Sequence, residues 1–228
     1  MNDVAQINID AKLIRSQSAA GITRGSGQED PSVRSTSDLA DTLELSNGCA
    51  CCSIQDELFD SFRQMLTLSD RRGKPFDAIV LENSGVAEPR NIRDLFQDAR
   101  QSPDAARRAV AGRVALANLV TVVDGSTFAK DFASRLPLAT RPDLGDGGGL
   151  RPVVDLLVEQ VECADVVVVN KADLLPEGKA ASLGQVVASL NPLARVVLAK
   201  WGAVDVPTVL GTREQSLMAR LTIEGTHR

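Results

Sequence analysis

A run of four valines, residues 166–169, constrains the fold of this chain more than any other feature. The run lies between Asp165 and Asn170, so it is apolar on both faces of an extended segment. A strand with two apolar faces must be covered on both sides, as happens inside a parallel sheet. The sequence therefore predicts a buried parallel strand over 165–175.

Strand-like and helix-like segments alternate along the rest of the chain. Strands are predicted at 41–48, 76–85, 117–127, 165–175 and 194–202, and helices at 53–68, 91–99, 153–164 and 177–191. This alternation is typical of an α/β fold with a mainly parallel sheet flanked by helices. Two segments without an apolar period, 15–37 and 134–150, are predicted to be flexible loops.

Composition argues against several classes of function. The 228 residues suit one domain, and their net charge of −5 argues against nucleic acid as the main partner. Six Phe, one Trp and no Tyr leave little for base stacking on a single strand. No apolar run approaches the roughly 18 residues of a membrane span, and no signal pattern opens the chain. We therefore expect a protein of the cytoplasm, with an organelle as the alternative, that binds neither membranes nor nucleic acid.

Polar residues follow several of the predicted strands directly. The sequences are NGCACC (47–52), ENSG (82–85), VVDGS (122–126) and NKAD (170–173). In an α/β sheet, ligands bind beyond the carboxyl ends of the strands. These four segments are therefore the candidates for functional sites.

The sequence Asn170-Lys171-Ala172-Asp173 follows the valine run without a gap. There, the carboxylate of Asp173 can accept hydrogen bonds from the N1–H and the amine of guanine. Adenine lacks this donor pair and would leave the carboxylate unpaired. Asn170 would hold the loop and contact the purine edge, and the stem of Lys171 would lie over the base. The alternative is an ordinary polar loop between a strand and a helix.

Glu82 and Gly85 end the predicted strand 76–85 and are the candidate catalytic residues. An acid at this place can hold the waters around a Mg²⁺ ion. A glycine lets a backbone N–H approach a terminal phosphate. Pro89 then favours the start of the next helix. The alternative is an ordinary turn between a strand and a helix.

Three of the four cysteines, Cys49, Cys51 and Cys52, fall within four positions after a glycine. Thiolates favour zinc and related metals, and three of them leave a fourth coordination position open. Such a site suits a metal that is taken up and released. Buried packing thiols and a redox pair are the alternatives. Cys163 is expected to pack in the core, and the only histidine, His227, is expected to be a bystander.

Five segments occur in the order and approximate spacing of the CobW-type metallochaperone GTPases: INIDAKLI, LELSNGCACC, ENSGVAEP, LVTVVD and NKADL. The chain resembles this family from Asn2 to about Gly211, and most closely its zinc-handling branch. The resemblance implies a three-layer, P-loop GTPase-like α/β fold and Mg²⁺-dependent hydrolysis of GTP. It also implies that Zn²⁺, or a similar ion such as Co²⁺, is held by Cys49, Cys51 and Cys52 and delivered to a client metalloprotein.

The sequence also departs from the family's pattern. It contains no G-x-x-x-x-G-K-[ST], which the family carries upstream of INIDAKLI, so the P-loop with its strand and helix is expected to be missing. Gln6 stands where the family usually has Glu, and Asn83 replaces a Ser or Thr. The family's C-terminal domain is also expected to be absent. GTP hydrolysis by this polypeptide is therefore expected to be negligible.

Two functions remain open at this point. The first is a GTP-binding and GTP-hydrolysing metallochaperone. The second is a metal-binding or protein-docking remnant of that family, without hydrolysis. In either case the nucleotide-binding domain is expected over 1–211, incomplete at its N-terminus and followed by a tail over 212–228. The expected partners are GTP or GDP, a client metalloprotein and, as one option, a second copy of the chain.

Overall fold

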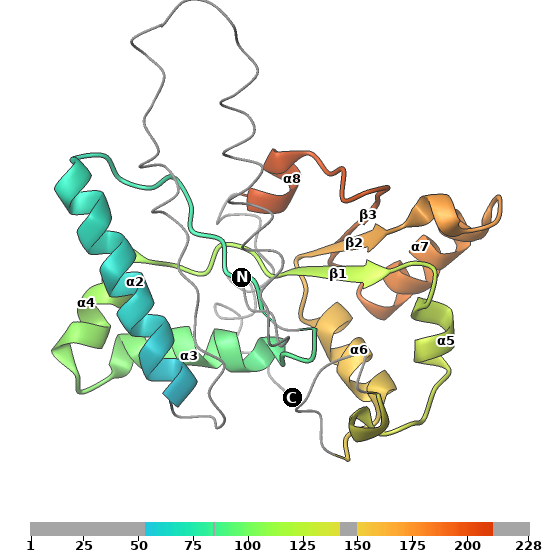
Figure 1. Ribbon diagram of the computed structural model, residues 1–228, viewed down its shortest axis with the longest axis horizontal. Coiled ribbons are helices and arrows are strands. Elements are labelled where there is room, and N and C mark those ends of the chain that lie inside the picture. The colour runs from blue at the N-terminus through green and yellow to red at the C-terminus, as the bar shows by residue number, and fades with distance from the viewer. Residues whose placement is uncertain (1–52, 84, 142–149, 212–228) are drawn as a thin grey trace, which may run out of the picture. The chain divides into compact units, whose positions relative to one another are not determined.

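The computed structural model describes residues 53–83, 85–141 and 150–211 (Figure 1). The chain forms two compact units, Met1–Gly85 and Val86–Arg228, and each is described by itself. The strand expected at 41–48 and the loop expected at 15–37 lie outside the described residues. The same holds for part of the loop expected at 134–150.

The first unit contains helix α2, Ser53–Arg72. Phe59 and Phe62 are buried, and their rings meet edge to face with centroids 6.1 Å apart. The helix ends at Arg72, and the left-handed backbone of the following Gly73 lets its N–H donate to a carbonyl of the last turn. The helix predicted over 53–68 is confirmed and continues for one further turn.

The segment 76–85 follows α2 and was predicted to be a buried strand. Its described residues form no strand, and Val80 is 77% exposed, so the prediction was wrong. The N–H and C=O groups of a strand need a neighbouring strand, and the described residues of this unit supply none. The apolar sequence Ala-Ile-Val-Leu does not replace that neighbour, because strand preference depends strongly on context.

The second unit contains the sheet. Its elements in chain order are α3 (Pro89–Gln101), α4 (Ala105–Arg113), β1 (Val120–Asp124), α5 (Phe128–Phe132), η2 (Leu138–Thr140), α6 (Val153–Glu162), β2 (Val166–Asn170), η4 (Ala172–Leu174), α7 (Lys179–Leu190), β3 (Arg195–Leu198) and α8 (Val206–Leu210). The described strands pair in parallel in the order β1-β2-β3 (Figure 1). The predicted α/β fold, a parallel sheet flanked by helices, is confirmed.

The valine run forms β2, the central strand of the described sheet. All four of its side chains are at most 4% exposed. Val167 and Val169 pack in a cluster with side chains from α5, α6 and α7, while Val166 and Val168 pack with Val120 and Ala199 on the opposite face. Fully burying a valine contributes roughly 1.5–3 kcal/mol, so this strand is a major source of stability. Both faces of β2, which the sequence predicts to be apolar, are therefore covered by packed side chains.

Asn191, the residue after α7, joins three elements of this unit. Its side-chain amide donates to three carbonyl groups at the end of α6, at 2.8, 3.1 and 3.0 Å: those of Val161, Glu162 and Ala164. Its side-chain oxygen accepts from two N–H groups in the turn before β3, both at 3.1 Å. The residue is 5% exposed. Five hydrogen bonds therefore fix the end of α6 against the turn that leads into β3.

Helices α3 and α4 precede the sheet and pack against each other. The helix predicted over 91–99 is confirmed as α3, which begins at Pro89 and is longer at both ends. Helix α4 was not anticipated. Its N-cap is Asp104, whose carboxylate accepts the N–H of Ala106 at 2.8 Å. The signal was present, because an Asp followed by a run of Ala and Arg favours the start of a helix.

Candidate functional site

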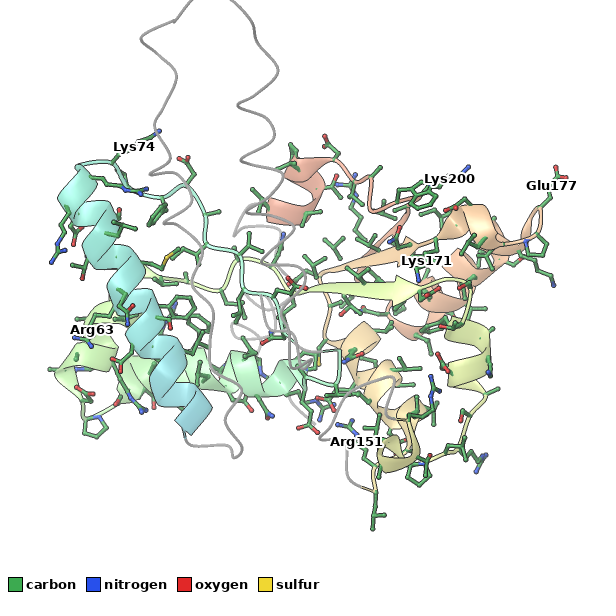
Figure 2. The ribbon with its side chains drawn as sticks, in the orientation of Figure 1. Arg63, Lys74, Arg151, Lys171, Glu177 and Lys200 are labelled. Atoms are coloured by element: carbon green, nitrogen blue, oxygen red, sulfur yellow. The ribbon has the colours of Figure 1, made fainter. Side chains whose placement is uncertain are left out.

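The carboxyl ends of β1 and β2 lie side by side. Asp124, the last residue of β1, is the register partner of Asn170, the last residue of β2. This edge of a parallel sheet is where ligands bind in α/β folds. Figure 2 shows Lys171 and Lys200 on the side of the sheet toward which the strands run. The structure thus brings together two of the predicted polar segments, VVDGS and NKAD.

The turn after β1 is fixed by Asp124 and Gly125. Oδ1 of Asp124 accepts hydrogen bonds from the backbone N–H of Ser126, at 2.9 Å, and from its hydroxyl. The N–H of Gly125 donates to the carbonyl of Asn170 at 2.9 Å. A Cβ on Gly125 would also lie 2.9 Å from that carbonyl oxygen, so any other residue type would force the backbone to shift. The glycine is therefore required for the two turns to meet.

Lys171 connects the same two strand ends through its side chain. Its Nζ lies 2.6 Å from Oδ2 of Asp124. Burial alone would raise the pKa of Asp124, but hydrogen bonds from Lys171 and Ser126 outweigh it, and the pKa is lowered. Lys171 also has a left-handed backbone with a φ of 57°, which residues other than glycine adopt at an energetic cost. The ammonium group is held, while the side chain as a whole stays half exposed.

Asn170 links β2 to the turn that follows β3. Its Oδ1 accepts the N–H of Gly202 at 3.0 Å. Two residues later, the N–H of Ala172 donates to the carbonyl of Ala199 at 3.0 Å. The turns after β1, β2 and β3 are therefore joined by hydrogen bonds. The side chain of Asn170 holds a neighbouring turn, and its contact with a purine stays a prediction.

Asp173 lies in η4, directly after β2. Its side chain is exposed and has no hydrogen-bond or ion-pair partner among the described residues. An ionised carboxylate accepts hydrogen bonds through both oxygens, and no residue in the described ranges occupies either of them here. The site thus presents an open acceptor two residues after the half-exposed Lys171. A planar base with two adjacent donors has the chemistry that such a site can bind.

Glu82 and Gly85 lie in the first unit, outside any strand, and both are exposed. A Cβ on Gly85 would meet no heavy atom within 4 Å, so packing within the described structure does not require this glycine. The strand-end residues belong to the second unit, so a joint role of the two sets stays a prediction.

The three clustered cysteines, Cys49, Cys51 and Cys52, lie outside the described residues. Within the described part of the chain, no group of three or more His, Cys, Asp or Glu residues is placed to hold a metal ion. Cys163 is a free thiol at the C-cap of α6, where it is half buried and hydrogen-bonds with Arg90. Cys163 was expected to pack in the core, and this was wrong because the residue is only half buried. Burial raises the pKa of its thiol.

An ion-pair cluster around Arg151 joins α6 to the start of α3. The guanidinium of Arg151, which is labelled in Figure 2, lies 2.7 Å from a carboxylate oxygen of Glu88 and 2.6 Å from one of Glu159. Arg90 lies 3.6 Å from the other oxygen of Glu159. Glu159 is buried, so these arginines compensate a charge that would otherwise be costly. No local pattern in the sequence indicates this cluster, because Glu88 and Arg151 are 63 positions apart.

Asp124 is the main residue of the site whose role sequence reasoning missed. It was recognised only as part of a polar strand end. Two signals pointed further: it ends an apolar segment, and a glycine and a serine follow it. Its link to Lys171 requires the register of β1 against β2, which the sequence pattern does not contain.

The sequence matches the family CobW/HypB/UreG, nucleotide-binding domain, over residues 1–198, and the chain belongs to this family. It is 29% identical over 212 residues to a "Zinc-regulated GTPase metalloprotein activator 1" of Dictyostelium discoideum, which covers 93% of this chain and 41% of that protein. It is 28% identical over 229 residues to a "Zinc chaperone CobW" of Pseudomonas aeruginosa, covering 99% and 54%. It is 30% identical over 177 residues to a "Zinc chaperone CobW" of Sinorhizobium, covering 75% and 46%.

The chain spans about half the length of these curated relatives. No solved structure was found to match it. None of the helices in the described ranges is both long enough and apolar enough to cross a membrane.

Proposed function

We propose that this chain is the nucleotide-binding part of a GTP-binding and GTP-hydrolysing metallochaperone. In this proposal Cys49, Cys51 and Cys52 bind zinc or a similar metal, which is delivered to a client metalloprotein. Membership of the CobW/HypB/UreG family and the printed names of the relatives, zinc chaperone and GTPase metalloprotein activator, support this class of function. The proposed domain spans 1–211, followed by a tail over 212–228.

The observation that carries the nucleotide proposal is the open carboxylate of Asp173 at the end of β2. Guanine offers N1–H and an amine side by side, and this carboxylate would accept both hydrogen bonds. The stem of Lys171 would lie over the base, with its ammonium group held by Asp124 at 2.6 Å. Asn170 would contact the purine edge while its Oδ1 holds the turn after β3. A base that lacks the donor pair would leave Asp173 unpaired, which supplies the specificity.

Glu82 and Gly85 are proposed to act at the phosphate end of GTP. The exposed carboxylate of Glu82 fits the preference of Mg²⁺ for oxygen ligands, often through bound water. Gly85 carries no side chain, which is why we propose that a phosphate approaches its backbone. When bound, the ion would offset the charge on the phosphate oxygens. Glu82 would orient its waters, and Gly85 would donate to a terminal oxygen.

In this proposal the metal is cargo that the chain passes on, not a cofactor that it keeps. Three thiolates leave one coordination position open on the ion. A ligand from the client can therefore bind there before the three thiolates release the ion. Coupling to GTP or GDP would decide when this transfer occurs. A second copy of the chain is a further proposed partner, since it would place two such sites in one assembly.

The choice of base tests the nucleotide proposal. In an Asp173→Asn variant, one acceptor becomes a donor that faces guanine's own donors, whereas xanthine carries an oxygen in place of the amine. Binding of GTP should weaken about 10- to 100-fold, the range expected for a lost hydrogen bond to a charged group. The affinity for xanthosine triphosphate should increase. Competition between the two nucleotides measures both effects. Glu177→Gln, which removes an exposed charge in the following loop, is the matched control and should change neither. Unchanged preference in the Asp173 variant would contradict the assignment.

A second candidate function is a metal-binding or protein-docking module that does not hydrolyse GTP. It would apply to a polypeptide that works without a G-x-x-x-x-G-K-[ST] sequence. In GTPases that sequence supplies backbone donors, a Lys and a Mg²⁺ ligand, and losing one comparable donor in other enzymes costs about 10²–10³ in rate. Phosphate release from GTP with Mg²⁺ and zinc separates the candidates. Turnover that Glu82→Ala abolishes supports the first, and zinc binding without turnover supports the second.

A further inference from the structure

The turn after β3 carries Trp201, a residue with two unfavourable features. Its side chain is 90% exposed, the highest value among the large apolar residues of the described chain. Its backbone is left-handed with a φ of 54°, which is costly for a bulky residue. Neither feature improves the packing of this unit. An exposed aromatic on a constrained backbone is instead typical of a residue that contacts a ligand.

This turn is joined to the proposed base-reading loop. The residue after Trp201, Gly202, donates its N–H to Oδ1 of Asn170 at 3.0 Å. Before it, Ala199 accepts the N–H of Ala172 at 3.0 Å. Trp201 is therefore held between two hydrogen bonds to the segment that ends in Asp173. Figure 2 shows the neighbouring Lys200 on the same side of the sheet as Lys171.

We propose that Trp201 stacks on the purine ring of the bound guanine nucleotide and supplies one wall of the base site. This inference rests on the proposed function. An indole offers a large flat π surface at a low cost in side-chain entropy, and bases stack on such surfaces. Stacking recognises the face of the ring, whereas Asp173 recognises its edge. Trp201 would therefore add affinity for flat bases, while Asp173 selects guanine among them.

The competing explanation is that the turn needs only its shape. The left-handed backbone places the N–H of Gly202 against Asn170, and any residue tolerant of that backbone would then serve. Glycine tolerates it best. A Trp201→Gly variant would keep the turn and remove the indole, whereas Trp201→Phe would keep an aromatic face. The two explanations predict opposite rankings of these variants.

The first measurement uses the fact that Trp201 is the only tryptophan of the chain. Titration of the 228-residue protein with GDP should change the tryptophan fluorescence along the same curve as GDP binding followed by equilibrium dialysis. Inosine diphosphate, which has the same ring face, should do the same. Pyrophosphate, which has no base, should leave the fluorescence unchanged. GDP binding without a change in fluorescence would overturn the inference.

The second measurement compares GDP affinity among variants by equilibrium dialysis. Trp201→Ala and Trp201→Gly should both weaken binding about 5- to 100-fold, the range reported for stacking on one base, and Trp201→Phe should retain most of it. If Trp201→Gly binds as tightly as the parent, the turn acts through its shape and the inference fails. If the parent protein binds no GDP, the proposed function fails and the inference with it. The two failures are therefore distinguishable.

Discussion

The Nζ atom of Lys171 lies 2.6 Å from Oδ2 of Asp124, so an ion pair joins the ends of β1 and β2. The other oxygen of that carboxylate is occupied by Ser126. Asp124 therefore orients the lysine whose stem is proposed to lie over the base. Because both partners are partly exposed, the pair contributes little to folding, about 1 kcal/mol or less. Its importance lies in holding a long, flexible side chain in one orientation.

Asp124→Asn should weaken GDP binding with little change in stability. The amide can still accept from Ser126, but it no longer attracts the ammonium group of Lys171. The lysine must then be ordered when the nucleotide binds, which costs about 0.5–1.5 kcal/mol, or about 2- to 12-fold in affinity. Equilibrium dialysis and urea unfolding measure the two quantities. Parent-like affinity in this variant would show that the pair does not prepare the site.

The protonation of Asp124 provides a second test. Its pKa lies below the ordinary value of 3.8 because the hydrogen bonds from Lys171 and Ser126 outweigh the effect of burial. The unfolded state binds this proton more readily, so the contribution to stability is complete above the unfolded pKa and is lost as the pH falls through the folded one. An NMR titration of the Asp124 carboxyl carbon should give a midpoint below 3.8. A midpoint at or above that value would contradict the ion pair.

Zinc binding should depend on the cysteine cluster and not on Cys163. We expect about one Zn²⁺ per chain, because three thiolates and one open position form a single site. Titration against a chromophoric chelator should show this site lost in a Cys49→Ser, Cys51→Ser, Cys52→Ser triple variant. Cys163→Ser is the matched control and should bind as the parent does, since its thiol is half buried with a raised pKa. Tight binding by the triple variant would exclude the cluster as the site.

Gly125→Ala and Gly184→Ala should have opposite effects on the free energy of unfolding. A Cβ on Gly125 would lie 2.9 Å from a backbone oxygen of Asn170, whereas one on Gly184 would lie 3.4 Å from a flexible leucine side chain. We expect Gly125→Ala to cost about 1–3 kcal/mol, because backbone must shift. Gly184 lies in α7, where alanine is favoured by up to about 1 kcal/mol. Urea unfolding of both variants checks the contrast, and equal effects would contradict the close approach of the two turns.

The sequence predicted those elements whose signals are local. The valine run identified β2 and its burial on both faces, because a strand of this composition has few other environments. Helix α2 followed from its apolar period in the same way. The strand predicted over 76–85 was wrong because a strand depends on a partner that no local pattern supplies. Helix α4 was missed because its Ala and Arg residues show little apolar periodicity, although Asp104 marks its start.

The same division holds for the candidate site. Asn170, Lys171 and Asp173 are neighbours in the chain, so one strand end places all three. The partners that fix them come from elsewhere: Asp124 is 47 positions from Lys171, and Gly202 is 32 positions from Asn170. Their placement follows from the order and register of β1, β2 and β3. The spacing of residues along the sequence specifies neither the order nor the register of the strands, so these contacts are found only in the structure.

Asn191 provides the last prediction, which concerns stability and its pH dependence. Asn191→Leu should cost about 2–4 kcal/mol, because buried carbonyl and N–H groups lose their partners. Asn191→Asp should also destabilise at pH 7, since a carboxylate would face three carbonyl oxygens. Burial and that repulsion favour the protonated form, so the folded state of the Asp variant retains its proton to higher pH than the unfolded state. Its deficit relative to the parent should therefore shrink as the pH is lowered from 7 towards the unfolded-state pKa of about 4, while that of Asn191→Leu should not. Ser189→Ala, which removes an exposed hydroxyl from the same helix, is the control for urea unfolding at pH 7 and pH 3.5. A deficit of the Asp variant that is the same at both pH values would contradict the hydrogen bonds assigned to Asn191.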